Sequence, residues 1–322
     1  MLTIFADQGG MSDSFSFWCD GSRVRWAFAA AFLALVGAAL VAAGLWVTVP
    51  AVPQTAFATA TLAGVAGNYR RGARSPRLSV VAEGLLLLVV IFAAGILLSY
   101  AAATIGLPYR DAAFDAADRA LGFNWQAYAA FVDSSPPLAT AYRLAYASLI
   151  PQLFILTVAL AAAGRFERLH RFLIAVVIAL TVTCTAFALM PAVSVYAYLQ
   201  VPIDSFTNIH PISTFQHVGP IAGLRAGEIT SISFADVHGL ITFPSFHACG
   251  AALLAWGFWS IRVLRWPFLI LNLLMIGATP IDGAHYFVDV IAGLALAGLA
   301  VLIANRLSRV PESASAPVAI AG

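Results

Sequence analysis

Long apolar stretches are the feature of this chain that most restricts its fold. A helix needs about 20 apolar residues to cross a bilayer core of roughly 30 Å. Stretches of that kind lie near residues 26–47, 78–104, 138–162, 172–198, 246–263, 266–282 and 285–305, with a shorter candidate at 51–67. Because 61% of the residues are hydrophobic and only 10% are charged, the sequence predicts an all-α, polytopic transmembrane helix bundle.

The basic residues, all of which are arginine, cluster between these stretches. Cytoplasmic loops of membrane proteins carry the excess of positive residues. For most of the arginine clusters to lie on the cytoplasmic side together, residues 51–67 must also cross the membrane. The arginines on that side are then Arg23, Arg25, Arg70, Arg71, Arg74, Arg77, Arg165, Arg168, Arg171, Arg262, Arg265, Arg306 and Arg309. We therefore expect a multi-pass protein of the inner (plasma) membrane, with eight crossings and both termini in the cytoplasm.

The expected organisation has three parts. Residues 1–77 form an N-terminal segment with a transmembrane hairpin, 78–305 a six-helix core, and 306–322 a disordered cytoplasmic tail. Two long loops, 105–137 and 199–244, lie on the outer side. The first favours one or two short helices along the membrane surface, and loops as long as the second are usually functional or disordered.

Three aspartates of the first outer loop, Asp111, Asp115 and Asp118, are spaced by four and three residues. On a helix this spacing puts them on one face. Such a face is most often solvated, and the sharper alternative is that it binds a polyol headgroup or a divalent cation.

Two histidines stand where apolar stretches begin on the outer side. In PSFH, Pro244 and Ser245 mark a helix N-terminus just before His247, where free amides and the helix dipole favour an anion. The last stretch begins GAHYFVDVIAG, in which His285 and Asp289 share a helical face. A carboxylate bonded to one ring nitrogen leaves the other nitrogen free to act as base or nucleophile. This pattern predicts a site that faces the periplasm or the exterior.

Other readings of these three residues stay open. Each histidine alone could be a structural residue of the interface, and the three groups could bind zinc, although no further ligand stands at close spacing. A non-enzymatic lipid-binding protein or transporter could also use them. Transporter sites usually lie near the bilayer midplane, whereas these groups stand at helix mouths.

The motifs PSFHA and GAHYFVDVIAG resemble the second and third signature motifs of the type 2 phosphatidic acid phosphatase (PAP2) superfamily, and the resemblance covers roughly residues 78–305. It implies a lipid phosphatase or phosphotransferase that forms a phosphohistidine, without cofactor or metal. It also implies that His285 is the nucleophile, Asp289 its orienting partner and His247 the general acid on the leaving oxygen.

The chain departs from the family pattern in two places. Ala278 and Thr279 stand where Ser-Arg usually precedes the histidine, and the first motif, with Lys and then Arg-Pro, is absent. The loss of that arginine and the presence of HYFVD form a pattern similar to that of the inositol phosphorylceramide synthase branch. The departure favours transfer of a phosphorylated headgroup over a phosphatase reaction with water. The expected partners are membrane lipids, namely a phospholipid and a lipid alcohol such as ceramide, and no nucleic acid.

A phosphoryl site still needs positive charge. Arg225, in the outer loop before His247, is the first candidate, and Arg143, about two turns below the outer end of its helix, is the second. The alternatives are a solvated loop charge for Arg225 and a side chain that snorkels to the interface for Arg143. Ser245 completes the predicted phosphate-binding set.

Overall fold

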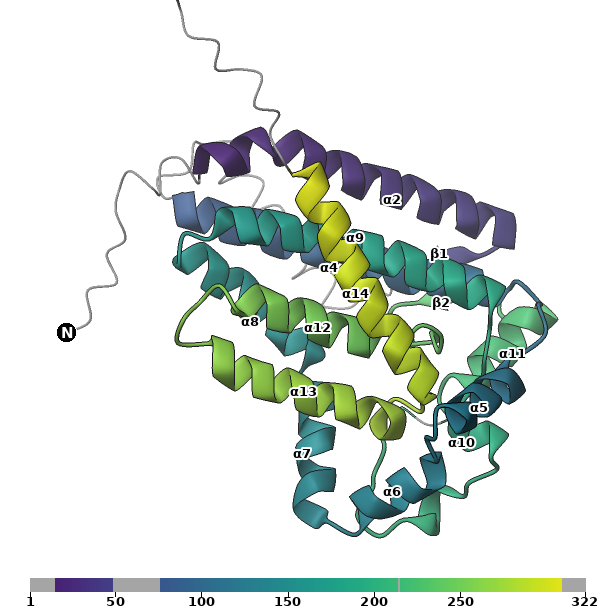
Figure 1. The fold of residues 1–322 in the computed structure, drawn as a ribbon. Coiled ribbons are helices and arrows are strands. Elements are labelled where there is room, and N and C mark those ends of the chain that lie inside the picture. The colour runs from purple at the N-terminus through teal and green to yellow at the C-terminus, as the bar shows by residue number, and fades with distance from the viewer. Residues whose placement is uncertain (1–14, 49–75, 214, 309–322) are drawn as a thin grey trace, which may run out of the picture.

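The computed structural model describes residues 15–48, 76–213 and 215–308 (Figure 1). The expected second span at 51–67 and most of the expected tail at 306–322 lie outside these residues. The regular elements of the described chain are helices, apart from two three-residue strands. This confirms the predicted all-α polytopic bundle.

Four helices are long and apolar enough to cross a membrane: α2 (Ser22–Ala43), α4 (Pro76–Ala103), α9 (Phe166–Leu189) and α14 (Phe287–Leu307). A fifth span is possible if α7 (Pro136–Ala147) and α8 (Leu149–Ala162) are taken together, although they are bent by 58°. By length and apolarity, the described part of the chain thus supplies four or five crossings, fewer than the eight expected for the whole chain.

The expected span at 246–263 is realised as a shorter helix, whereas the one at 266–282 has its expected length. Helix α12 (Phe246–Phe258) has 13 residues and α13 (Arg265–Asp282) has 18. At 1.5 Å per residue, α12 is only about 20 Å long. Between them, the backbone turns at residues 259–264 instead of continuing the helix to 263 as predicted.

The span expected at 172–198 is displaced toward the N-terminus. Helix α9 begins at Phe166 and ends at Leu189, followed by the short helix α10 (Val195–Tyr198). Pro191 explains the early end, because a residue that precedes proline is disfavoured in the helical region. Met190 accordingly has φ −132° and ψ 61°.

The apolar helices pack into one bundle in which α2, α4 and α9 lie side by side and α14 crosses α9 and α12 obliquely (Figure 1). Leu87 of α4, Leu156 of α8 and Phe172 of α9 are among the side chains that fill the interior. Since the remaining faces of these helices are apolar as well, the bundle presents apolar side chains to its surroundings.

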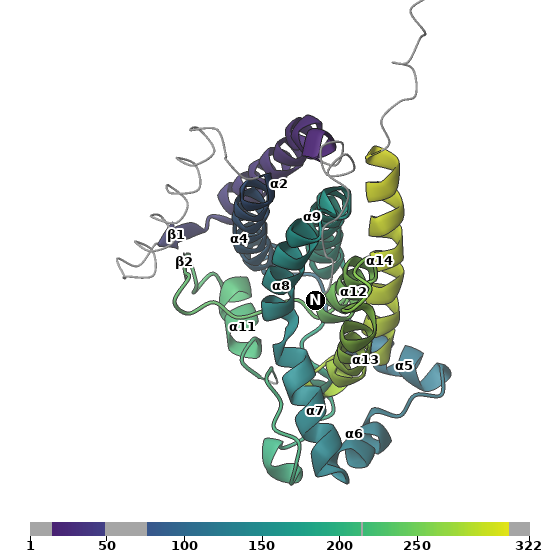
Figure 2. The same cartoon turned by 90° about the vertical axis from the view of Figure 1, so that its left-hand side faces the viewer.

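The short helices gather at one end of the bundle (Figure 2). The first outer loop forms α5 (Asp111–Ala120) and α6 (Trp125–Asp133), two short helices as expected. The second contains the 3₁₀ turn η1 (Ile203–Ser205) and α11 (Val218–Ala226). Strand β1 (Trp46–Thr48), just after α2, pairs in parallel with β2 (Ser231–Ser233) of this loop.

Candidate active site

Helix α12 begins as the sequence predicts. Ser245 is its N-cap, and the Ser245 hydroxyl oxygen accepts a hydrogen bond from the Ala248 amide at 3.3 Å. His247 therefore lies in the first turn, where helix amides still lack intrahelical acceptors and the dipole is positive. This end of α12 is suited to a negatively charged group.

His285 and Asp289 form the pair that their spacing predicts. The His285 Nδ1 lies 3.2 Å from Asp289 Oδ2, and both side chains are almost completely buried, with 4% and 0% exposed. The Tyr286 amide donates to the same oxygen at 3.0 Å. Because a carboxylate only accepts, Nδ1 carries the proton and the lone pair of the neutral ring is at Nε2. No described residue hydrogen-bonds to that Nε2.

The corner between α13 and α14, which carries His285, is fixed by hydrogen bonds from the outer loops. The last carbonyls of a helix have no intrahelical donor, and three of those at the end of α13 accept hydrogen bonds from other elements. The pairs are Trp125 Nε1 to Pro280 (2.9 Å), Tyr196 hydroxyl to Ile281 (3.0 Å) and Ser213 amide to Asp282 (2.9 Å).

Asp118 secures the other side of this corner. Its carboxylate accepts hydrogen bonds from the Phe287 amide at 2.7 Å and the Val288 amide at 2.8 Å, the first two amides of α14. Burial raises the pKa of Asp118, and these two amides partly offset that effect. Asp118 thus acts as a cap supplied by one helix to another.

The expectation of a solvated acidic face on α5 is wrong for two of its three aspartates. Asp118 is 2% exposed, and Asp111 is 6% exposed. Asp111 accepts hydrogen bonds from the Val193 amide and from the Tyr286 hydroxyl, the latter at 2.9 Å. Both carboxylates face inward because free backbone amides beside the His285 corner need acceptors. Asp115 alone makes the surface pair expected of such a face, with Arg119.

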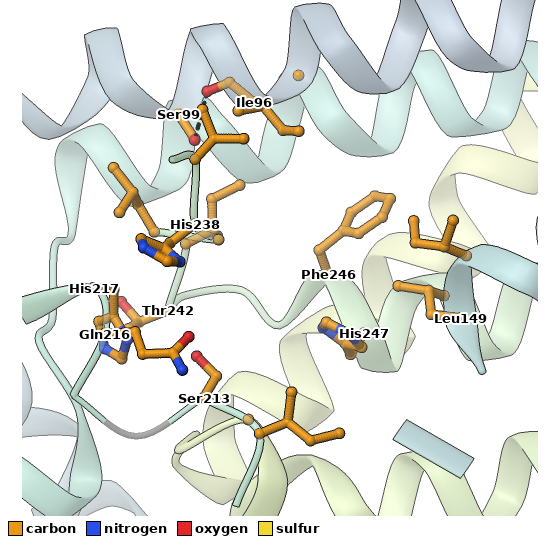
Figure 3. A pocket seen from close by; sticks show the side chains of 18 of the residues that line it. Ile96, Ser99, Leu149, Ser213, Gln216, His217, His238, Thr242, Phe246 and His247 are labelled. Carbon is orange, nitrogen blue, oxygen red and sulfur yellow. Dashed lines mark hydrogen bonds between the residues drawn. The ribbon is translucent and has the colours of Figure 1, made fainter. Parts of the chain in front are cut away.

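His247 and His285 line the same cavity, whose volume is about 430 Å³. The ring of Tyr146 stacks on that of His247, with centroids 3.8 Å apart and planes 12° from parallel. His217 and His238 line the cavity from the second outer loop, across from His247 (Figure 3). The remaining wall is largely apolar and includes Phe92, Ile96, Leu149 and Leu180. A molecule with a polar and an apolar end fits such a lining.

The structure does not bring the two predicted arginines into this lining, and no arginine lines the cavity among the described residues. Arg143 lies exposed on α7. The guanidinium of Arg225 lies 3.9 Å from the centre of the Tyr109 ring. Among the described residues, the source of positive potential at the cavity is therefore the N-terminus of α12.

Sequence reasoning did not single out His217 or the stacking partner Tyr146. The second outer loop was recognisable as rich in histidine, but an irregular loop has no periodicity that tells which side chain turns inward. Tyr146 was recognisable only as a neighbour of Arg143 on one helical face. Its contact with His247 depends on how α7 packs beside α12.

Comparisons with known proteins bear on this site. A family model described as the PAP2 superfamily matches residues 112–303, a range that contains both histidines and Asp289. No curated protein and no solved structure matches the chain in the corresponding searches.

Proposed function

The chain belongs to the PAP2 superfamily, and from this premise we propose that it cleaves a lipid phosphoester through a phosphohistidine on His285. The observation that carries the proposal is the shared cavity of His247 and His285, in which Asp289 holds His285 Nδ1 and leaves Nε2 free.

In the first step, Nε2 of His285 attacks the phosphorus atom. A P–N bond forms, the bond between phosphorus and the lipid oxygen breaks, and His247 gives a proton to the departing oxygen. Asp289 stabilises the charge that develops on the His285 ring. The N-terminus of α12 offsets negative charge on the phosphoryl oxygens.

In the second step, a hydroxyl oxygen attacks the phosphorus atom. The P–N bond breaks, a P–O bond forms, and the hydroxyl proton passes to His247, which returns to its starting state. A water molecule as acceptor makes the protein a phosphatase, and a lipid or polyol hydroxyl makes it a phosphotransferase. The absence of the first motif and the presence of HYFVD favour headgroup transfer of the inositol phosphorylceramide synthase type.

The test is incubation of the purified protein in detergent with labelled phospholipids, with and without alcohols such as ceramide or inositol. His285→Ala is expected to lower turnover at least about 10³-fold. The control is His210→Ala, because His210 is an exposed histidine of the second outer loop and does not line the cavity. If His285→Ala matched the wild type in every assay, the phosphohistidine would be refuted, and lipid binding or transport would replace it.

Arg225 and Arg143 stay predictions as phosphate-binding residues. Arg225→Ala is expected to lower turnover severely without unfolding the protein if the arginine reaches the substrate. Unchanged kinetics would remove it from the site.

We further propose that the cavity opens to the periplasm or exterior, because the arginine clusters favour the opposite end of the bundle as cytoplasmic. Cys19, which is exposed near the start of α2, and a cysteine in place of the exposed Arg119 report the two ends. In intact cells with a permeabilised outer layer, a membrane-impermeant maleimide should label Arg119→Cys and not Cys19. The reverse pattern would invert the topology.

A further inference from the structure

His217 is a buried histidine that the reaction described above does not use. It is 3% exposed, it precedes the first turn of α11, and it lines the cavity together with His247 and His285. Buried polar atoms in proteins are normally hydrogen-bonded, so each ring nitrogen of His217 is expected to have a partner.

One nitrogen has a fixed partner. His217 Nε2 hydrogen-bonds to the carbonyl oxygen of Val193. Since a carbonyl oxygen only accepts, Nε2 carries the proton. The other nitrogen, Nδ1, is buried and has no hydrogen-bond partner among the residues that the structure describes.

The environment keeps this ring neutral. Burial lowers the pKa of His217 most, the bond to Val193 opposes that effect, and the charges of His285 and His238 lower the pKa against the opposing effect of Asp111. A neutral ring protonated at Nε2 has an acceptor lone pair at Nδ1. Such a nitrogen pairs with a hydroxyl donor and not with a phosphoryl oxygen.

The polar groups beside His217 have the same preference. Ser213 and Gln216 line the cavity on this side, with His247 across the open space (Figure 3). Hydroxyl and amide groups both donate to and accept from hydroxyls. No arginine and no carboxylate lines the cavity in the described part of the chain, so a neutral hydroxylated group suits this side better than a charged one.

This side of the cavity is also tied to the reacting corner. The Val193 carbonyl accepts from His217, and the Val193 amide donates to Asp111, which accepts from the Tyr286 hydroxyl next to His285. The Ser213 amide is bonded to the Asp282 carbonyl at the same corner. His217 is therefore held in a fixed place relative to His285, which a specificity group requires.

We propose that Ser213, Gln216 and His217 form a subsite for a neutral polyol group, with His217 Nδ1 accepting a hydrogen bond from one of its hydroxyls. The inference rests on the proposed function, since the polyol is either the headgroup esterified to the reacting phosphorus or a free acceptor. In both cases its hydroxyl binds at His217 while phosphorus reacts at His285.

The informative variant is His217→Gln. A glutamine amide nitrogen can take the place of Nε2 and keep the bond to Val193, while the acceptor at Nδ1 is lost. His217→Asn is the reciprocal variant, because it places a polar atom near Nδ1 and loses the Val193 bond. Together they separate a role in folding from a role in binding.

The assay measures release of diacylglycerol from three lipids in the same detergent: phosphatidylglycerol, phosphatidylethanol, which lacks headgroup hydroxyls, and phosphatidic acid. The wild type should prefer phosphatidylglycerol over phosphatidylethanol in kcat/KM by about ten-fold, the ratio that one net hydrogen bond supplies. His217→Gln should abolish the preference while leaving phosphatidylethanol and phosphatidic acid unchanged, and His217→Asn should retain part of it.

A second arm distinguishes the two sources of the polyol. Free glycerol is added to phosphatidic acid, and the share of phosphate recovered as glycerol phosphate is measured. A loss of this share in His217→Gln, without a headgroup preference in the wild type, would assign the subsite to a free acceptor. If His217→Gln matched the wild type in both arms, the subsite would be refuted. Failure of the proposed function is a separate result, since His285→Ala would then remain active on every lipid.

Discussion

At the scale of single residues, the placement of Asp118 shows how the site depends on a side chain that does not touch the cavity. Asp118 belongs to α5, yet its two oxygens accept the first two amides of α14. Those amides follow His285 by two and three residues. Moving this helix end would move the imidazole relative to His247, so Asp118 is a positioning residue.

Asp118→Asn should therefore impair both stability and turnover. The variant keeps the shape of the side chain but loses the negative charge at a helix N-terminus and one of two acceptors. Loss of a helix cap costs about 0.5–2 kcal/mol, and we expect about 1 kcal/mol here. Unfolding in detergent checks the stability, and kcat with KM checks the site, where kcat should fall about ten-fold with little change in KM.

The matched control is Asp115→Asn on the same helix. Asp115 pairs with Arg119, whose side chain is 66% exposed, and exposed pairs contribute about 0–1 kcal/mol. Equal effects of the two variants on kcat would contradict a positioning role for Asp118.

At the scale of helices, the site depends on the close approach of α14 to the start of α12. The Ser245 amide donates to the Asp289 carbonyl at 3.0 Å. A Cβ atom built on Gly293 would lie 2.4 Å from the Ser245 carbonyl oxygen, a backbone atom that cannot rotate away. Glycine at position 293 thus allows the helix with His285 to reach the helix with His247.

Gly293→Ala should push these two helices apart. Overpacking of this kind costs about 1–3 kcal/mol, and a displaced His247 should lower kcat at least about ten-fold. Gly298→Ala on the same helix is the control, because a Cβ there meets nothing within 4 Å. That control should be neutral or slightly stabilising, since alanine favours the helix. Thermal unfolding and kcat of both variants test the contact, and a neutral Gly293→Ala would show that the helices are not in contact as described.

The features that could be predicted from the sequence are those that depend on residues close together in the chain. The cap at Ser245 and the pair of His285 with Asp289 depend on spacings of three and four residues, and both were predicted. The end of α9 before Pro191 depends on a local rule that hydropathy alone overlooks. The inward turn of Asp118 and His217 depends on partners more than 20 residues away in sequence, and neither composition nor periodicity carries that information.

At the scale of the whole molecule, the N-terminal helix α2 is joined to the bundle by a buried ionic cluster. Arg25, which is 2% exposed, pairs with Glu83 of α4 at 3.1 Å and hydrogen-bonds to His170 of α9 at 3.0 Å. The indole nitrogens of Trp18 and Trp26 also donate to Glu83. Three helices therefore meet at Arg25, and no residue of this cluster lines the cavity.

Removing one partner of the pair of Arg25 and Glu83 should lower the free energy of unfolding far more than removing both partners. Glu83→Leu leaves Arg25 as a buried charge without its carboxylate and should cost about 3–5 kcal/mol. In the double variant with Arg25→Leu no such charge remains, although Trp18 and Trp26 still lose their acceptor. A double-mutant cycle on unfolding in detergent should then give a coupling free energy of at least about 1.5 kcal/mol.

The exposed pair of Glu167 and Arg171 on α9 supplies the control cycle, for which we expect about 0.2–0.5 kcal/mol. Because the cluster lies away from His285, the folded fraction of Glu83→Leu should keep its kcat while α2 becomes accessible to proteolysis. A coupling free energy equal to that of the surface pair would mean that the ion pair does not hold α2 to the bundle. A loss of kcat in the folded fraction would mean that α2 supports the site as well as the bundle.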